Sequence, residues 1–284
     1  MEEILGSVAQ VGMLGFVVTS MLATGTSLTV AQIIDPLRNL RLVAGMLLAN
    51  FVAVPLLALL LTRILPMDAP AATTLILLGT MAGAPFLPKL AQGAKGDVAF
   101  SVGLMVLLMV VTIAYAPLVV PLLVEGADVA AWDIAKPLLF LMLLPLALAL
   151  FCRERYPDFA VSWSPQLASI SSGSLTIALA AAAFIAYDEL LGAVGSQIFI
   201  GTVLLAVGSA VIGWFFAPGG TAVRSVAGLG TAQRNLAAAQ LVAGTSFGGQ
   251  TLVLTLAASL ALTLVLIFAS GEIGRRRGEP ATAT

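Results

Sequence analysis

The sequence predicts an all-α integral membrane protein. Of its 284 residues, 60% are hydrophobic and only 10% are charged, whereas soluble domains contain about 45–50% apolar and about 25% charged residues. The mean hydropathy is +1.08. A chain this apolar has more apolar surface than a soluble core of its length can bury. A spanning helix needs about 20 mostly apolar residues, so nine helices with their loops nearly fill the chain.

Nine apolar stretches are predicted to cross the membrane. The expected spans are 4–27, 40–63, 70–88, 97–123, 134–152, 165–187, 192–216, 222–243 and 248–270. The segment 28–37 is too short and too polar to span, and we expect it at the membrane interface. The first residues carry no basic region, so the first span is not interpreted as a cleaved signal peptide. The charged segment 272–284 is expected to be a disordered cytoplasmic tail.

The positions of the basic residues predict the orientation of the chain. Only Arg63 and Lys136 follow even-numbered spans, and Arg234 lies inside the eighth span. The remaining ten of the thirteen basic residues follow odd-numbered spans: Arg38, Arg41, Lys89, Lys95, Arg153, Arg155, Arg224, Arg275, Arg276 and Arg277. Because Lys and Arg accumulate in cytoplasmic loops, this bias predicts a multi-pass protein of the cell membrane with its N-terminus outside and its C-terminus in the cytoplasm.

Two of the spans carry sequences that break a helix. The third span ends in 83–89 (GAPFLPK), where two prolines forbid a continuous helix. The eighth contains the polar, glycine-rich run 228–235 (GLGTAQRN). Interrupted spans in both halves of a chain indicate an inverted-repeat transporter whose site lies where they cross. The alternatives are an interfacial loop for the prolines and a close helix contact for Gly228 and Gly230.

Arg234 is the most informative residue within a span. An arginine at the centre of a spanning helix costs about 2.5–3.5 kcal/mol on insertion scales, so it should face a cavity or a partner. A structural role is an ion pair with Asp97, or the capping of carbonyls where the helix breaks. A functional role is a fixed charge for an anionic substrate, or a replacement for a bound metal ion.

Other polar residues inside the spans are candidates for the same site. Asn50 in the second span can bond a neighbouring helix or a ligand. Ser101 in the fourth can bond a ligand or its own backbone. Gln233 and Asn235 flank Arg234, and the weaker candidates in the eighth span are Gln240 and Thr245.

The residue counts exclude several kinds of functional site. The chain has no histidine, and Cys152 is its only cysteine, which excludes His-based triads, zinc clusters and disulfides. No span contains a pair of carboxylates, and no glycine-rich phosphate loop follows a strand pattern. We therefore predict that the protein is not an enzyme and has no nucleic-acid partner.

Three stretches resemble the bile acid:sodium symporter family: 41–55 (RLVAGMLLANFVAVP), 94–105 (AKGDVAFSVGLM) and 230–244 (GTAQRNLAAAQLVAG). The resemblance implies a core domain with two crossing broken helices and a panel domain. Family members have two inverted five-helix repeats, or nine helices when the first is missing. The chain resembles the nine-helix form, with half-repeats 1–123 and 124–271 and a tail from 272 to 284.

The resemblance carries the family's sodium ligands over only in part. Alignment on Asn235 places Gly230 where the family has a glutamate and Arg234 where it has a glutamine. The family's Ser-Asn pair falls within 85–88, and its Ser and Thr of the next helix fall at Ser101 and Met105. A family glutamine becomes Asn50, which leaves Asn50, Ser101 and Gln233 as the weak sodium candidates.

These replacements argue against sodium coupling. Hard cations need several oxygen ligands, preferably with a carboxylate, and a guanidinium about 4 Å from a sodium ion would repel it by on the order of 4 kcal/mol at an effective dielectric near 20. The hypothesis is that Arg234 replaces the bound cation, and no other cofactor is predicted.

The predicted function is that of a secondary transporter that moves a small organic anion by alternating access. Helix N-termini at the breaks would attract the anion. The predicted substrate-binding residues are Arg234, Asn235, Gln233, Asn50, Ser101 and Gly230. The alternatives are a sodium-coupled bile-acid-type symporter, an uncoupled uniporter or channel of the same fold, and a membrane receptor or scaffold. The other expected partner is membrane lipid, and the sequence does not determine the substrate or the oligomeric state.

Overall fold

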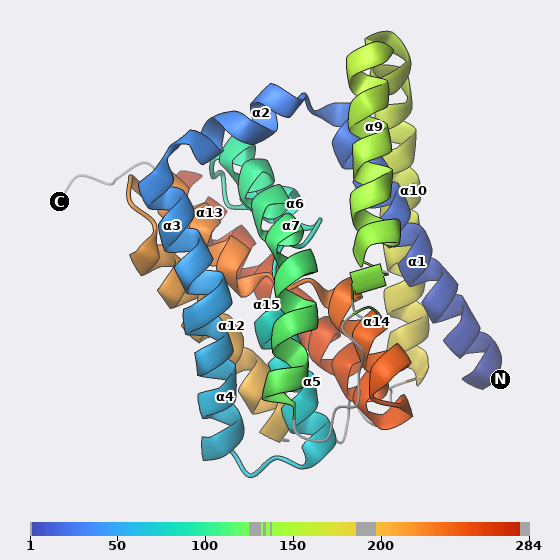
Figure 1. Ribbon diagram of the computed structural model, residues 1–284, viewed down its shortest axis with the longest axis vertical. Helices are drawn as coiled ribbons and strands as arrows, with labels where there is room; N and C mark the ends of the chain where they lie inside the picture. Colours follow the sequence, from blue (N-terminus) through green and yellow to red (C-terminus); the bar gives the residue numbers. More distant parts are fainter. Residues whose placement is uncertain (1, 125–131, 133–134, 137, 186–196, 279–284) are drawn as a thin grey trace.

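The chain folds into helices joined by short connections in the computed structural model (Figure 1). The structure describes residues 2–124, 132, 135–136, 138–185 and 197–278, and these contain no strand. The all-helical class predicted from composition is therefore confirmed for the part of the chain that is described.

The first half of the chain begins with a long helix and then alternates long and short elements. These elements are α1 (Glu2–Ser27), α2 (Val30–Ile34), the 3-10 turn η1 (Asp35–Arg38), α3 (Leu40–Leu48), the π-helical segment η2 (Ala49–Ala53), α4 (Val54–Ile64), α5 (Ala69–Thr80), α6 (Leu87–Gly93) and α7 (Val98–Leu123).

The second half also alternates long and short helical elements. Its elements are the π-helical segment η3 (Leu138–Leu143), α9 (Leu144–Arg155), α10 (Pro157–Ile185), α12 (Gln197–Phe216), α13 (Thr221–Ala232), α14 (Leu236–Ser246) and α15 (Gly249–Gly278). The predicted starts of the fifth and seventh spans, at 134 and 192, lie outside the described residues.

Among the described residues, five helices are long and apolar enough to cross a membrane: Gly6–Ser27, Leu40–Ile64, Val98–Leu123, Gln197–Phe216 and Gly249–Arg277. They establish a multi-pass membrane protein, and the full count of nine spans stays a prediction. The second of these helices joins α3 and α4 through η2, where the N–H of Val54 bonds the carbonyl of Ala49. Pro55 follows directly, and its missing N–H and bulky ring explain why the helix widens there.

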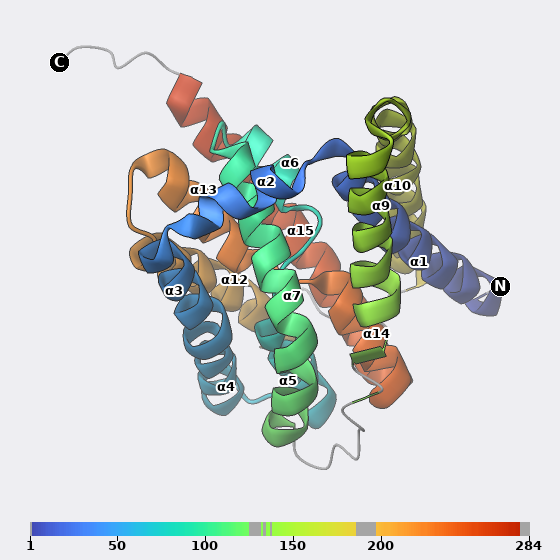
Figure 2. The same cartoon turned by 45° about the horizontal axis from the view of Figure 1, so that its top comes forward.

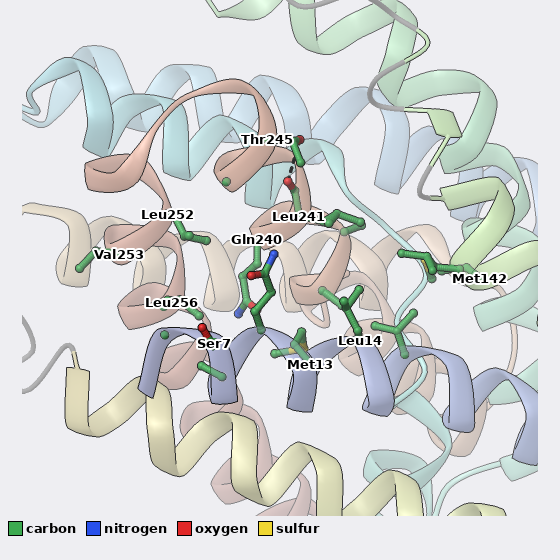
Figure 3. A pocket seen from close by; sticks show the side chains of 18 residues that line it. Ser7, Met13, Leu14, Met142, Gln240, Leu241, Thr245, Leu252, Val253 and Leu256 are labelled. Atoms are coloured by element: carbon green, nitrogen blue, oxygen red, sulfur yellow. Dashed lines mark hydrogen bonds between the residues drawn. The ribbon is translucent and has the colours of Figure 1, made fainter. Parts of the chain in front are cut away.

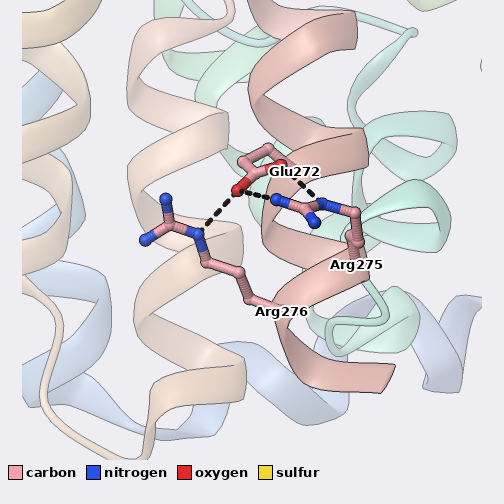
Figure 4. A network of polar contacts seen from close by, with 3 residues as sticks. All are labelled: Glu272, Arg275 and Arg276. Carbon is pink, nitrogen blue, oxygen red and sulfur yellow. Dashed lines mark hydrogen bonds and ion pairs between the residues drawn. The ribbon is translucent and has the colours of Figure 1, made fainter. Parts of the chain in front are cut away.

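The C-terminal segment differs from the prediction. Helix α15 continues to Gly278, so the expected disorder is wrong for residues 272–278, while 279–284 lie outside the described residues. The Glu272 carboxylate accepts bonds from Arg275 and Arg276 on its own helix at 2.9 and 2.7 Å (Figure 4). Such pairs one turn apart support a helix.

Arg277 ties the end of α15 to two other connections. It donates to the carbonyls of Ala94 and Lys95 at 2.9 and 3.0 Å, between α6 and α7. It also donates to the carbonyl of Thr221 and the hydroxyl of Ser225, at the start of α13. Two connections and the C-terminal end of α15, all predicted to lie on the cytoplasmic side, therefore meet in the structure.

The helices form two groups. Figure 1 shows α1, α9 and α10 side by side, apart from the other long helices, and their mutual contacts confirm this grouping. We call these three helices with η3 the first group and the remaining long helices, with α5, α6, α13 and α14, the second group. Figure 2 shows α2 running from the end of α1 toward α3, so that it links the two groups.

Candidate functional site

The two predicted breaks are present, and they contact each other. The first lies between Thr80 and Leu87, and the second between Ala232 and Leu236. The backbone N–H of Asn235 donates to the carbonyl of Met81 at 2.8 Å. The second break is shorter than the polar run suggested, because α13 continues through Gly228 and Gly230.

These two glycines provide close helix packing. A Cβ on Gly228 would lie 2.9 Å from the carbonyl oxygen of Ala210, and one on Gly230 would lie 2.9 Å from the side chains of Leu87 and Leu104. The small-residue interpretation of this part of the run is therefore confirmed. Gly230 packs beside the first break and lines neither of the two cavities described below.

The first break is shaped by Gly83. Its φ of +79° is a left-handed conformation, and a Cβ there would collide with the backbone of Met109 on α7. The Thr112 hydroxyl, on the same helix, donates to the carbonyl of Ala82 at 3.0 Å and accepts its N–H at 3.2 Å. The N–H and the carbonyl of Ala82, which the break releases, are thus satisfied inside the protein, as membrane depth requires.

Arg234 lies in the second break and is fully buried. Its Nε donates to the carbonyl of Leu78 at 2.7 Å, and one Nη to that of Gly79 at 2.7 Å. The other Nη donates to the carbonyl of Thr231 and to Oδ1 of Asn50, both at 2.9 Å. Four oxygen atoms from three segments of the chain therefore surround one guanidinium.

Two structural roles are possible for Arg234: an ion pair with Asp97 and the capping of carbonyls. The structure shows the capping of carbonyls. The Asp97 carboxylate instead accepts the N–H of Phe100 at 2.9 Å, as the N-cap of α7. No ion pair found among the described residues involves Arg234.

The surroundings of Arg234 carry partial negative charge. Leu78 and Gly79 are in the last turn of α5, and Thr231 is in the last turn of α13. Carbonyl ends of helices carry about half a negative charge each, and both of these ends meet the same guanidinium. The arrangement stabilises a cation without a carboxylate.

Asn50 belongs to this cluster, and Ser101 does not. The Asn50 amide donates to the carbonyl of Met46 at 3.0 Å and to the hydroxyl of Thr231 at 3.1 Å, while its oxygen accepts from Arg234. The Ser101 hydroxyl donates to the carbonyl of Val98 at 2.6 Å, which is the local alternative considered for it. Both side chains are fully buried.

Asn235 and Gln233 line a small cavity of about 30 Å³, whereas Arg234 does not. The Asn235 oxygen caps α14 by accepting the N–H of Ala238 at 3.1 Å, and its nitrogen donates to the carbonyl of Gly83 at 3.2 Å. Nε2 of Gln233 donates to the carbonyl of Arg234 at 3.3 Å, whereas its Oε1 has no partner.

A larger cavity of about 500 Å³ lies between the two groups of helices (Figure 3). It is lined by α1 and η3 of the first group and by α14 and α15 of the second. Most of its lining is apolar, and the polar side chains include Gln10, Gln240 and Thr245. Met13, Ala237 and Gln240 line both cavities, so the small cavity adjoins the large one.

The predicted site residues thus separate into two sets. Arg234 and Asn50 form the buried cluster, and Gln233 and Asn235 line the small cavity. Gln240 and Thr245, to which the sequence gave less weight, line the large cavity. Sequence reasoning missed Ser259 of α15, which lines the small cavity, because a lone serine in an apolar span usually bonds its own helix.

The three weak sodium candidates have different contacts. Asn50 uses its oxygen for Arg234, Ser101 bonds its own helix, and Gln233 lines the small cavity. Nor do the described residues contain a cluster of three acidic, cysteine or histidine side chains that could hold a metal. The guanidinium of Arg234 already bonds the oxygens of Leu78, Gly79, Thr231 and Asn50.

The chain is 29% identical over 206 residues to a protein from Oryza sativa subsp. japonica described as "Probable sodium/metabolite cotransporter BASS2, chloroplastic", and the match covers 71% of this chain and 48% of that relative. The chain therefore spans about half the length of the curated relative it matches.

A family model matches most of the first two thirds of the chain. The model described as "Sodium Bile acid symporter family" matches residues 13–193, which is more than half of the chain. This family consists of transporters, which confirms the prediction that the protein is not an enzyme. The chain belongs to the sodium bile acid symporter family.

Proposed function

We propose that the protein is a secondary transporter that moves a small organic anion by alternating access, without sodium coupling. The observation that carries this proposal is the position of Arg234. Its guanidinium lies between the carbonyl ends of α5 and α13, where it takes the place of a bound cation.

The architecture proposed for this function has nine spans in two inverted half-repeats, 1–123 and 124–271. The first group of helices is the panel, and the second is the core that carries the two crossing broken helices. The contacts of Arg277 with Lys95 and Thr221 support the assignment of these basic connections to one side. By the charge bias, this side is cytoplasmic, and the N-terminus lies outside the cell membrane.

An organic anion suits both the cavity and its electrostatics. The large cavity is mainly apolar and can hold the body of a small molecule. Arg234 carries a charge that none of the described carboxylates neutralises through an ion pair, and its neighbours Gln233 and Asn235 line the small cavity. Helix α14 also begins at the small cavity. The dipole of this helix and the guanidinium of Arg234 therefore both favour a negative group there.

The contacts between the two groups support alternating access. Near the first break, Lys89 of α6 donates to the hydroxyl of Ser172 on α10 at 2.6 Å. Closer to the N-terminus of α1, the large cavity separates α1 from α14 and α15. Rocking of one group against the other would close this cavity and open the opposite side.

Absence of sodium coupling follows from the same cluster. A sodium ion would compete with the guanidinium for the oxygens of Leu78, Gly79 and Thr231, and it would be repelled by the charge of Arg234. Because the arginine is covalently attached, its charge stays at the second break during the transport cycle.

Uptake of labelled carboxylates with apolar bodies into vesicles that contain the purified protein tests this function. We expect saturable uptake, and strong loss of it in Ala237→Phe, because the added ring fills the junction of the two cavities. The melting temperature (Tm) of the variant verifies that it is folded, and empty vesicles provide the background. Flux without saturation would indicate a channel, and the absence of uptake under every gradient would favour a receptor or scaffold.

A further inference from the structure

A charged side chain forms a hydrogen bond across the seam between the first and second groups of helices. Nζ of Lys89 on α6 donates to the hydroxyl of Ser172 on α10 at 2.6 Å. The Ser172 hydroxyl donates in turn to the carbonyl of Ala168 on its own helix at 2.9 Å, so it serves the lysine as an acceptor. Lys89 takes part in none of the ion pairs that the described residues form. Hydrogen bonds from an ammonium group are stronger than bonds between neutral groups.

This bond lies one helical turn beyond the small cavity. Phe86 and Leu175 line that cavity. Lys89 is three residues after Phe86, and its N–H bonds the Phe86 carbonyl at 3.1 Å. Ser172 is three residues before Leu175 on α10. Because residues three apart on a helix share a face, the bond joins α6 to α10 directly beneath the small cavity.

The bond and the large cavity lie at different levels along α15, which is one continuous helix. The large cavity contacts α15 at residues 252–256. Near the other end of this helix, the Ser270 hydroxyl donates to the carbonyl of Leu90, the neighbour of Lys89. A helix rises about 1.5 Å per residue, so the two levels are about 20 Å apart. The Ser270 end is cytoplasmic in the proposed orientation, and the bond therefore closes the cytoplasmic side.

A lysine suits a contact that has to open and close. Its stem is flexible and its ammonium group is readily hydrated. Lys89 is exposed, so water can replace Ser172 when the helices separate, and no buried donor is left unpaired. A different contact across the seam, from Nδ2 of Asn235 to Sδ of Met142 at 3.5 Å, has a weak acceptor. The lysine bond is therefore the stronger of these two contacts.

We propose that Lys89 and Ser172 form the cytoplasmic gate of the transporter. Their bond holds α6 against α10 while the large cavity on the other side is open, and it breaks when the two groups rock to open the cytoplasmic side. This inference rests on the proposed function and names the residues that control access to the same site.

Thiol labelling from the cytoplasmic side tests the gate without a substrate. Cys152 is the only cysteine of the chain, so a Cys152→Ser background removes other thiols. In this background, Leu175→Cys places a thiol at the small cavity, one turn behind the gate. An impermeant maleimide added to inside-out vesicles reaches this thiol when the gate opens. We expect Lys89→Met and Ser172→Ala each to raise the labelling rate roughly tenfold, which is the usual effect of losing a hydrogen bond to a charged group.

Two matched controls separate the gate from general effects of charge and helix stability. Lys95→Met removes the same charge on the same side, but the described bonds of Lys95 involve only its backbone. Ser169→Ala removes a hydroxyl of α10 that bonds its own helix, at the carbonyl of Pro165. Both controls should be labelled at the parent rate, and the Tm of each variant verifies that it is folded. Parent rates in both gate variants, or equal acceleration by the controls, would overturn the gate and leave the transport function standing.

A reversible cross-link tests whether the gate has to open during transport. In the Cys152→Ser background, Lys89→Cys and Ser172→Cys are combined and joined by a short bifunctional methanethiosulfonate, which a reductant removes. We expect uptake of labelled carboxylates to stop on cross-linking and to return on reduction. Unchanged uptake after complete cross-linking would overturn the gate. Faster labelling in the gate variants, together with no uptake before cross-linking, would support the gate and overturn the proposed transport function.

Discussion

Replacement of Arg234 by methionine is expected to lower the Tm of the purified protein by about 10 °C. Methionine retains much of the side-chain length but leaves four oxygens without donors: the carbonyls of Leu78, Gly79 and Thr231, and Oδ1 of Asn50. At about 1 kcal/mol for each unpaired acceptor, the loss is about 4 kcal/mol, and 1 kcal/mol corresponds to roughly 2–4 °C in a protein of this size. Thermal unfolding in detergent measures the effect.

A shorter replacement, Arg234→Ala, tests whether the oxygen cluster is a cation site. Guanidinium chloride well below denaturing concentrations should raise the Tm of Arg234→Ala, because the free ion can occupy the space of the lost side chain. It should not raise the Tm of the wild type. Arg63→Met is the matched control, since Arg63 is exposed at the end of α4 and its loss should change the Tm little. A wild-type Tm in Arg234→Met would contradict the proposed role of the arginine.

Replacement of Gly83 by alanine should have an effect of similar size. The residue has a φ of +79°, which disfavours any side chain, and the new Cβ would collide with the backbone of Met109. Relief of this collision must move the break away from α7, which disrupts the pairing of Ala82 with Thr112. We expect a Tm lower by about 10 °C and loss of uptake, because the break no longer supports Asn235.

Gly173→Ala is the matched control for this experiment. Gly173 lies inside α10, and a Cβ there would contact nothing within 4 Å. Alanine favours a helix over glycine by about 0.5–1 kcal/mol, so this variant should be as stable as the wild type or slightly more stable. If Gly83→Ala behaved like Gly173→Ala, the tight contact between the first break and α7 would be refuted.

The sequence was sufficient to predict the helical class and both broken spans. Composition determined the class, because so apolar a chain can fold only in a membrane. The prolines of 83–89 and the polar residues of 233–235 indicated the breaks. Proline lacks the N–H that a continuous helix needs, and polar side chains in an apolar span need partners. Arg234 was identified for the same reason, as a charge that an apolar span does not tolerate without partners.

Tertiary contacts determined what the sequence left open. Capping of carbonyls by Arg234 depends on α5 lying against the second break, and no local pattern encodes that approach. Ser259 became part of the small cavity because α15 packs beside the break. The extension of α15 to Gly278 depends on Arg277, whose partners lie in two distant connections.

The role of Arg234 as a built-in cation is tested most directly by the Tm of the wild-type protein in sodium chloride and in potassium chloride at equal ionic strength. A ligand that binds only the folded state stabilises it by about 2.7 kcal/mol at a hundred times its dissociation constant, so a sodium site would raise the Tm in sodium alone. If Arg234 is the built-in cation, the two melting curves will coincide at every concentration tested. A rise specific to sodium would show that the protein binds this ion despite the arginine, and would contradict transport without sodium coupling.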